Sequence, residues 1–154
     1  MDNDLHGCYL RKGRCTLPGQ VYLVTAASYR RQAFFSELAL GRLVVHEFMR
    51  SAAMNHAHTL AFVVMPDHFH WLMSLGFPLP LSGVVDNVKG HSARSVNTVL
   101  GRAGMPVWQR GFHDHALRRE ESVKDVARYI VANPLRAGLV RRVEDYALWD
   151  AEWL

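Results

Sequence analysis

The chain has 154 residues, of which 49% are hydrophobic and 21% are charged, and its formal net charge is +4. This length is typical of one domain that buries enough surface to fold without disulfides or a structural metal. No apolar run approaches the roughly 18 residues that a membrane span requires, and the polar N-terminus has no signal-peptide core. We therefore expect a cytoplasmic protein, with an N-terminal arm over residues 1–19 and a single domain over residues 20–154.

The charge is unevenly distributed along the chain. Residues 89–142 hold eleven Lys and Arg against four acids, whereas residues 51–88 hold no Lys or Arg. A basic segment of this kind can attract the phosphates of a nucleic acid, although it is also compatible with solvated helix faces. The two cysteines, Cys8 and Cys15, lie in the arm and have no second pair, so we expect reduced thiols.

The hydrophobic periodicity and the turn residues predict six elements. They are a strand over 20–28, a helix from a Ser36 cap to about Asn55, a hairpin with strands over 58–65 and 68–75, a helix from a Ser82 cap to about Leu100, an extended segment over 108–118 with a fourth strand, and a helix opened by Ser122 and stopped near Asn133 by Pro134. This order predicts a ferredoxin-like α+β sandwich, an antiparallel sheet with helices on one face and an added C-terminal helix. The other face of the sheet is then free for a ligand.

The strand over 68–75 carries two histidines with one residue between them. Because side chains alternate along a strand, His68 and His70 point the same way, and the apolar side chains of Phe69, Trp71, Met73 and Leu75 point toward the helices. Two imidazoles at this spacing can converge on one divalent metal, and Asp67 is placed to orient one ring. On its own the pair is also compatible with polar residues on a solvated face.

The last predicted helix carries a second candidate group. Tyr129 and Asn133 are four residues apart and share a face, at the edge of an apolar stripe. A tyrosine phenol can attack a phosphodiester, and a neighbouring metal can assist its ionisation. The Asn133 oxygen is a candidate third metal ligand. The alternative is an aromatic packed with its hydroxyl in water, followed by the last residue of a helix before proline.

Several motifs together resemble those of a known family. The run Val64-Met-Pro-Asp-His-Phe-His-Trp-Leu-Met73 is similar to the HUH motif, in which U is a hydrophobic residue, of single-tyrosine transposases. The resemblance is closest to the REP-associated tyrosine transposases. It extends over about residues 20–148 and includes Lys89–Asn97, Val107–Asp114, Leu117-Arg118 and Tyr129–Val140.

The resemblance implies a fold, a reaction and a partner. Single-stranded DNA that contains hairpins of repetitive elements would bind across the sheet, and Mg²⁺ or Mn²⁺ would be held by His68, His70 and Asn133. Tyr129 would attack a backbone phosphate, become linked to the 5′ phosphate and release a 3′ hydroxyl that can rejoin strands, as in DNA transposition and recombination. The family includes dimers in which the tyrosine serves the partner's site, so both a monomer and a homodimer remain open.

Basic residues in the second half of the chain are the candidate DNA contacts: Lys89, Arg94, Arg110, Arg118 and Arg119. A second His-x-His, His113 and His115, is interpreted as structural or as a DNA contact. Two other functions are considered. A histidine-triad hydrolase would need a third histidine where Leu72 stands, and a non-catalytic DNA-hairpin binder would keep the fold without the reaction.

Overall fold

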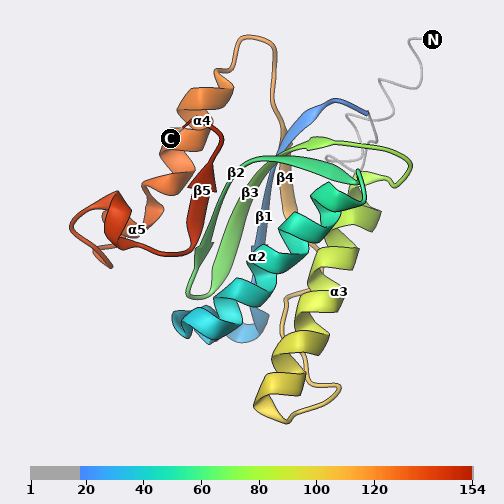
Figure 1. Ribbon diagram of the computed structural model, residues 1–154, viewed down its shortest axis with the longest axis vertical. Helices are drawn as coiled ribbons and strands as arrows, with labels where there is room; N and C mark the ends of the chain where they lie inside the picture. Colours follow the sequence, from blue (N-terminus) through green and yellow to red (C-terminus); the bar gives the residue numbers. More distant parts are fainter. Residues whose placement is uncertain (1–17, 154) are drawn as a thin grey trace.

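The computed structural model describes residues 18–153, which form one antiparallel sheet flanked by helices (Figure 1). The strands are β1 (Val21–Ala27), β2 (Ala57–Met65), β3 (His68–Leu75), β4 (His113–Ala116) and β5 (Trp149–Ala151). Their order in the sheet is β4-β1-β3-β2-β5, so the first four strands have the expected ferredoxin-like arrangement. Most of the arm over residues 1–19, with Cys8 and Cys15, lies outside the described residues.

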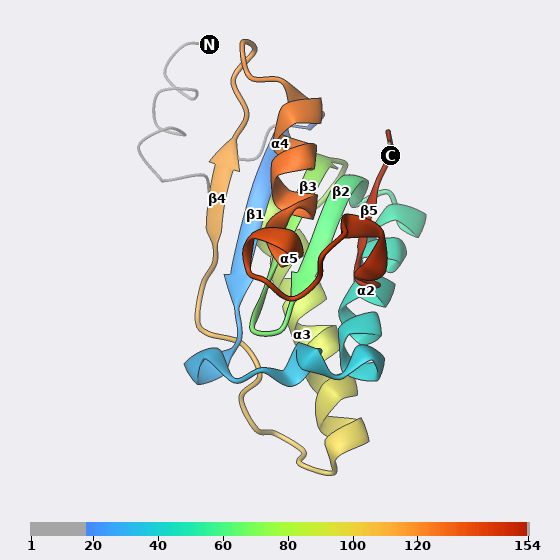
Figure 2. The same cartoon turned by 90° about the vertical axis from the view of Figure 1, so that its left-hand side faces the viewer.

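The helices lie on both sides of this sheet. They are α2 (Leu38–Ala53), α3 (Leu81–Leu100), α4 (Val123–Val131) and α5 (Asn133–Arg136), with short 3-10 turns η1 (Tyr29–Arg31), η2 (Phe34–Ser36) and η3 (Val143–Asp145). Figures 1 and 2 show α2 and α3 on one face and α4 and α5 on the other. No helix within residues 18–153 is long and apolar enough to cross a membrane.

The core between the sheet and α2 and α3 is aromatic, and it confirms the alternation expected along β3. Phe69, Trp71 and Met73 are fully buried there. The ring of Phe48 on α2 stacks on that of Trp71, with 4.6 Å between the centroids, and meets the edge of Phe69 at 5.1 Å. The neighbouring positions on β3 therefore face the opposite side of the sheet.

That opposite side is not wholly free, which corrects the expectation of an open face. Ala127, Ile130 and Val131 of α4 are buried in a second apolar cluster that also contains Val63 and Leu72 of the sheet. The strong apolar stripe of α4 needs a surface to cover, and the sheet provides it. A ligand can therefore reach only the part of this face beside α4 and α5.

The expected helix caps are correct at one site and wrong at two. Ser122 Oγ accepts a hydrogen bond from the Asp125 backbone N–H at 3.2 Å, as the capping motif predicts. Ser36 instead ends the 3-10 turn before α2, and Ser82 lies inside α3, which begins after Pro80. Pro80 cannot donate a backbone hydrogen bond, so the start of a helix accommodates it without loss.

The C-terminal part departs from the expected single helix. The helix α4 ends at Val131, and the chain turns at Ala132 into the short helix α5, with Pro134 in its first turn. Proline is tolerated there because the first N–H groups of a helix have no internal partner. The chain then returns to add β5 to the edge of β2, an element that was not predicted.

We expect the aromatic core to dominate stability. Phe48→Ala should lower the free energy of unfolding by about 3–5 kcal/mol, because it removes a fully buried ring from three aromatic neighbours. The neighbouring Met49 is 65% exposed, so Met49→Ala should change it by less than about 0.5 kcal/mol. Urea unfolding measures both, and equal midpoints for the two variants would contradict this packing.

Candidate active site

The two histidines lie at the start of β3, just after the hairpin turn that joins it to β2. His68 and His70 are half-buried and face the side of the sheet that carries α4 and α5. Their rings meet edge to face, with 4.9 Å between the centroids. Phe69, between them, is buried against Phe48 and Trp108 on the other face. The strand therefore holds both imidazoles side by side.

Each imidazole has one ring nitrogen engaged by a neighbour. His68 Nδ1 lies 2.8 Å from the Asp67 carboxylate, and His70 Nδ1 lies 2.8 Å from the Thr25 hydroxyl on β1. In the tautomer that carries hydrogen on Nδ1, each ring donates to its oxygen partner and leaves the Nε2 lone pair free. This carboxylate–histidine arrangement is the one that fixes metal-binding imidazoles in known sites.

An arginine completes the support of His68. Arg31 Nε lies 3.2 Å from the second oxygen of Asp67, so a chain of contacts runs from Arg31 through Asp67 to His68. Arg30 and Arg31 both adopt positive φ, at 54° and 56°. Non-glycine residues rarely adopt this conformation, and here it accompanies a side chain that reaches the candidate site.

The environment of His70 keeps its ring neutral. Burial is the main cause, and the charges of His68 and Arg136 add to it, so that the pKa of His70 falls from 6.5 to about 4. A neutral imidazole is the form that can bind a metal.

Arg136 links Tyr129 and Asn133, because its guanidinium contacts both side chains. Tyr129 projects from α4 with 65% of its surface exposed, and the Arg136 guanidinium lies 4.0 Å above the centroid of its ring. Arg136 also donates to Asn133 Oδ1 at 2.9 Å, while Asn133 Nδ2 donates to the Ile130 carbonyl. The charge of the same guanidinium contributes to the lowered pKa of His70, and α4 packs on the histidine face of the sheet, so these groups lie on one side of the sheet.

The donor set of the candidate site fits a divalent cation. Within residues 18–153 no three His, Cys, Asp or Glu side chains form a metal-binding group, so a third protein ligand has to be of another type. An amide oxygen such as Asn133 Oδ1 is a suitable one. The Nε2 atoms of His68 and His70 are the other two candidate ligands, and the Asp67 carboxylate orients the His68 ring.

The structure divides the expected DNA contacts into two groups. Arg110, Arg118 and Arg119 are exposed on the segments that flank β4, whereas Lys89 and Arg94 belong to α3 on the other face. Lys89 Nζ donates to the carbonyls of Gln109 and Gly111 at 2.8 and 2.6 Å, and burial lowers its pKa. Lys89 therefore holds the segment that leads into β4 and lies away from the histidines.

The second His-x-His extends the histidine side of the sheet. In the sheet register, Thr25 on β1 pairs with His70 on one side and with His113 on the other. Residues in one such row face the same way, so His113 lies on the face of the candidate site and is exposed. His115, two residues on, bonds Glu121 at 2.9 Å.

Three residues of the candidate site were not identified from the sequence. Thr25 and Arg31 contact the histidine motif only through the sheet register and a local turn, which no spacing reveals. The sequence does indicate Arg136, because it lies three residues after Asn133 and therefore on the same helical face as Tyr129 and Asn133.

The depressed pKa of His70 predicts a pH dependence of stability. The unfolded chain binds this proton near pH 6.5 and the folded chain only near pH 4, so the free energy of unfolding should rise with pH across this window. The contribution is fully present above pH 6.5, and up to about 3 kcal/mol is lost as the pH falls through 4. Urea unfolding between pH 4.5 and 7 should show a shallower pH slope in His70→Gln, and an unchanged slope in the exposed control His46→Gln. Equal slopes in His70→Gln and wild type would contradict the assignment.

Comparisons with known proteins agree with this fold. The family model described as "Transposase IS200 like" matches residues 18–133, a range that includes the histidine pair, Tyr129 and Asn133. None of the curated proteins is significantly similar in sequence to the chain.

Two solved structures share the fold. A REP-associated tyrosine transposase, solved bound to a REP hairpin, is 21% identical over 87% of this chain and 78% of its own, with a TM-score of 0.69. A putative transposase from Deinococcus radiodurans R1 is 24% identical over 72% of this chain and 87% of its own, with a TM-score of 0.50. The family model spans most of the chain, from β1 to the end of α4. The chain therefore belongs to the IS200-like transposase family.

Proposed function

We propose that this protein cleaves and rejoins single-stranded DNA, with Tyr129 as the nucleophile and a divalent cation on His68, His70 and Asn133. One observation carries the proposal. Two imidazoles with their Nδ1 atoms engaged lie on the face of the sheet that α4 covers, and Arg136, which lies over the ring of the exposed Tyr129, also helps to lower the pKa of His70.

The chain's own residues prepare this site for a metal. Asp67 and Thr25 orient the rings, and the neutral state of His70 leaves its nitrogen available as a ligand. When bound, the cation polarises the phosphate that is attacked and stabilises the charge that develops on it. Of the two expected ions, Mn²⁺ accepts imidazole ligands more readily, whereas Mg²⁺ strongly prefers oxygen.

Tyr129 performs the covalent step in this proposal. Its phenolic oxygen attacks the phosphorus and loses its proton, and the bond from phosphorus to the 3′ oxygen breaks. The 5′ phosphate is then esterified to Tyr129, and the 3′ oxygen leaves as a hydroxyl after taking up a proton. The reverse attack by a 3′ hydroxyl rejoins a strand without a nucleotide cofactor, because the ester retains the energy of the broken bond.

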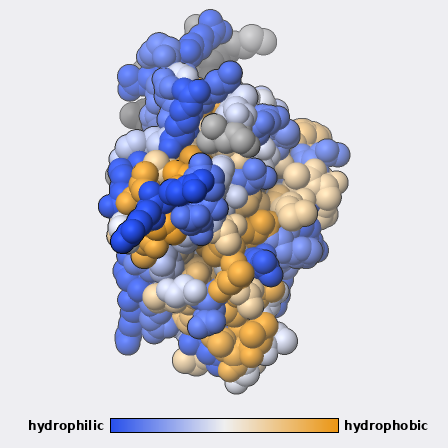
Figure 3. Space-filling model, turned by 60° about the vertical axis from the view of Figure 1, so that its left-hand side comes forward, coloured by the Kyte–Doolittle hydropathy of each residue, from blue (hydrophilic) through white to orange (hydrophobic). Residues whose placement is uncertain are grey.

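The surface beside α4 is our candidate path for the DNA. Figure 3 shows that the side carrying α4 and α5 is hydrophilic at its upper end, and that hydrophobic residues gather lower down. The exposed cations Arg110, Arg118 and Arg119 can contact phosphates, and His113 lies between them on the histidine face. A transposase of the same fold was solved with a REP hairpin, and we propose hairpin-containing DNA as the partner here.

A non-catalytic DNA-hairpin binder is the second candidate. The observation in its favour is that Asn133 Oδ1, the proposed third ligand, already accepts a hydrogen bond from Arg136. Both candidates bind DNA, and only the first forms a covalent bond to it.

The nucleophile can be tested by covalent trapping. Labelled single-stranded hairpin DNA incubated with the protein and Mn²⁺ should give an adduct that survives a denaturing gel. Tyr129→Phe keeps the ring under Arg136 but removes the attacking oxygen, so it should give no adduct. Tyr146→Phe is the matched control, because the hydroxyl of that tyrosine donates to the Val64 carbonyl and should retain adduct formation. An undiminished adduct in Tyr129→Phe would refute the assignment.

The metal site can be tested separately from the DNA surface. His68→Ala and His70→Ala should each abolish cleavage and leave most of the DNA affinity measured without divalent metal, because the exposed arginines are unchanged. Asp67→Asn should weaken Mn²⁺ binding about 10- to 100-fold, since it removes the carboxylate behind His68. Asp86→Asn, a change of the same chemistry on α3, should leave Mn²⁺ binding unaltered. Calorimetric titration measures the affinities, and wild-type Mn²⁺ binding in His70→Ala would exclude this site.

A further inference from the structure

Arg136 is an exposed cation that contacts both Tyr129 and Asn133 in the candidate site. Tyr129, Asn133 and Arg136 follow one another at spacings of four and three residues, so they share one face across the break between α4 and α5. Among the described residues no carboxylate forms an ion pair with Arg136. It also lies beyond residue 133, where the family match ends.

Two contacts define what its guanidinium does in the protein without DNA. It lies over the Tyr129 ring and donates to Asn133 Oδ1 at 2.9 Å. Its charge and planar fork are suited to bind a phosphodiester. It lies over the ring of Tyr129, the residue of the proposed nucleophile, so a phosphate bound to Arg136 would lie close to that residue.

The contact with Asn133 has a consequence for the metal. A divalent cation on Asn133 Oδ1 would lie beside a guanidinium that bonds the same oxygen, and the two positive charges would repel each other. A phosphate bound to Arg136 removes this conflict, because it draws the guanidinium away and neutralises its charge.

We infer that Arg136 binds the scissile phosphodiester of single-stranded DNA and thereby releases the Asn133 amide oxygen to the divalent cation. This inference rests on the proposed function. Metal and DNA should then bind cooperatively, with Arg136 as the residue that couples them. Coupling of this kind is reciprocal, so DNA tightens metal binding by the same factor by which metal tightens DNA binding.

The test is an electron paramagnetic resonance titration of Mn²⁺, with and without a saturating mixed-sequence 30-nucleotide single-stranded DNA. All proteins carry Tyr129→Phe, which prevents cleavage and keeps the aromatic ring. Without further change, we expect DNA to tighten Mn²⁺ binding about 10-fold, a typical size for coupled sites. Arg136→Gln should bind Mn²⁺ more tightly than its parent in the absence of DNA, and addition of DNA should tighten its Mn²⁺ binding less than it tightens that of the parent.

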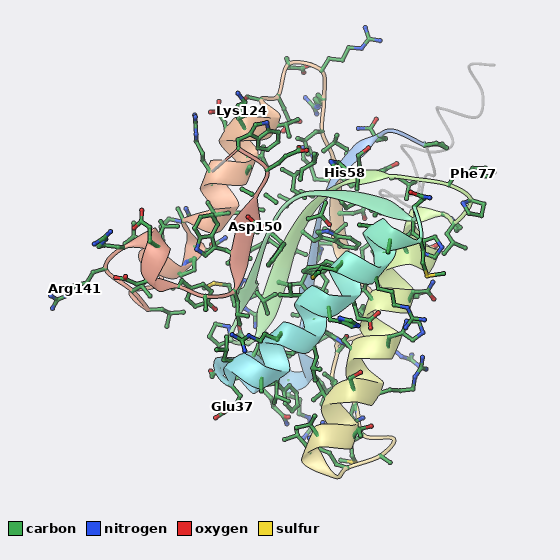
Figure 4. All side chains as sticks on the ribbon, in the orientation of Figure 1. Glu37, His58, Phe77, Lys124, Arg141 and Asp150 are labelled. Atoms are coloured by element: carbon green, nitrogen blue, oxygen red, sulfur yellow. The ribbon has the colours of Figure 1, made fainter. Side chains whose placement is uncertain are left out.

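Arg141→Gln is the matched control. Arg141 is also exposed, lies shortly after α5 and points outward from the molecule (Figure 4). This variant should keep both the weaker Mn²⁺ binding and the 10-fold effect of DNA. If it behaved like Arg136→Gln, net charge alone would explain the result and the inference would fail.

The phosphate contact has a readout of its own. In the same background, the dependence of DNA affinity on salt should become shallower by about 0.7 in a double logarithmic plot for Arg136→Gln, as expected for one lost phosphate contact on a single strand. An unchanged salt slope would overturn the contact.

A failure of the inference can be distinguished from a failure of the proposed function. If His70→Ala weakens Mn²⁺ binding but Arg136→Gln matches its parent with and without DNA, the inference alone is wrong. If His70→Ala also binds Mn²⁺ like its parent, the metal site itself is refuted and the inference falls with it.

Discussion

The candidate site depends on the alternation of side chains along β3. This strand is hydrogen-bonded to β1 on one side and to β2 on the other, so its register is fixed at both edges. Burial of Phe69 and Trp71 against the helices places His68 and His70 on the opposite face. A slip of one residue would put both imidazoles into the aromatic core, at the cost of burying polar groups without partners. The forces that stabilise the fold thus also orient the proposed metal ligands.

The second constraint is the placement of α4 and α5 on the histidine face. Ile130 and Val131 cover part of the sheet in the second apolar cluster, and burial is the main cause that keeps His70 neutral. The break at Ala132 preserves one face from Tyr129 to Arg136 although the helix changes direction. Hydrophobic packing of the helix therefore brings the proposed nucleophile and Arg136 to the face of the sheet that carries the histidines.

The sequence predicted the parts of this arrangement that are encoded locally. The strand over 68–75, the alternation of its side chains and the Ser122 cap follow from period and residue type, and the structure confirms them. The contact of Thr25 with His70 depends on sheet register, and that of Arg31 with Asp67 on a turn with positive φ; neither is visible in a spacing. Lys89 stays a predicted DNA contact, but its hydrogen bonds to the Gln109 and Gly111 carbonyls depend on the tertiary fold and are not visible in the sequence. The strand β5 could not be predicted, because its three residues are too few to show the alternation of apolar and polar side chains that marks a strand.

The central claim is that a DNA 5′ phosphate becomes esterified to Tyr129. Tandem mass spectrometry of the protein after reaction with single-stranded DNA and Mn²⁺, followed by nuclease and protease digestion, tests this directly. The account predicts one modified peptide, with a nucleotide attached through its 5′ phosphate to Tyr129. A nucleotide on any other residue, or hydrolysed DNA without a modified peptide, would contradict it.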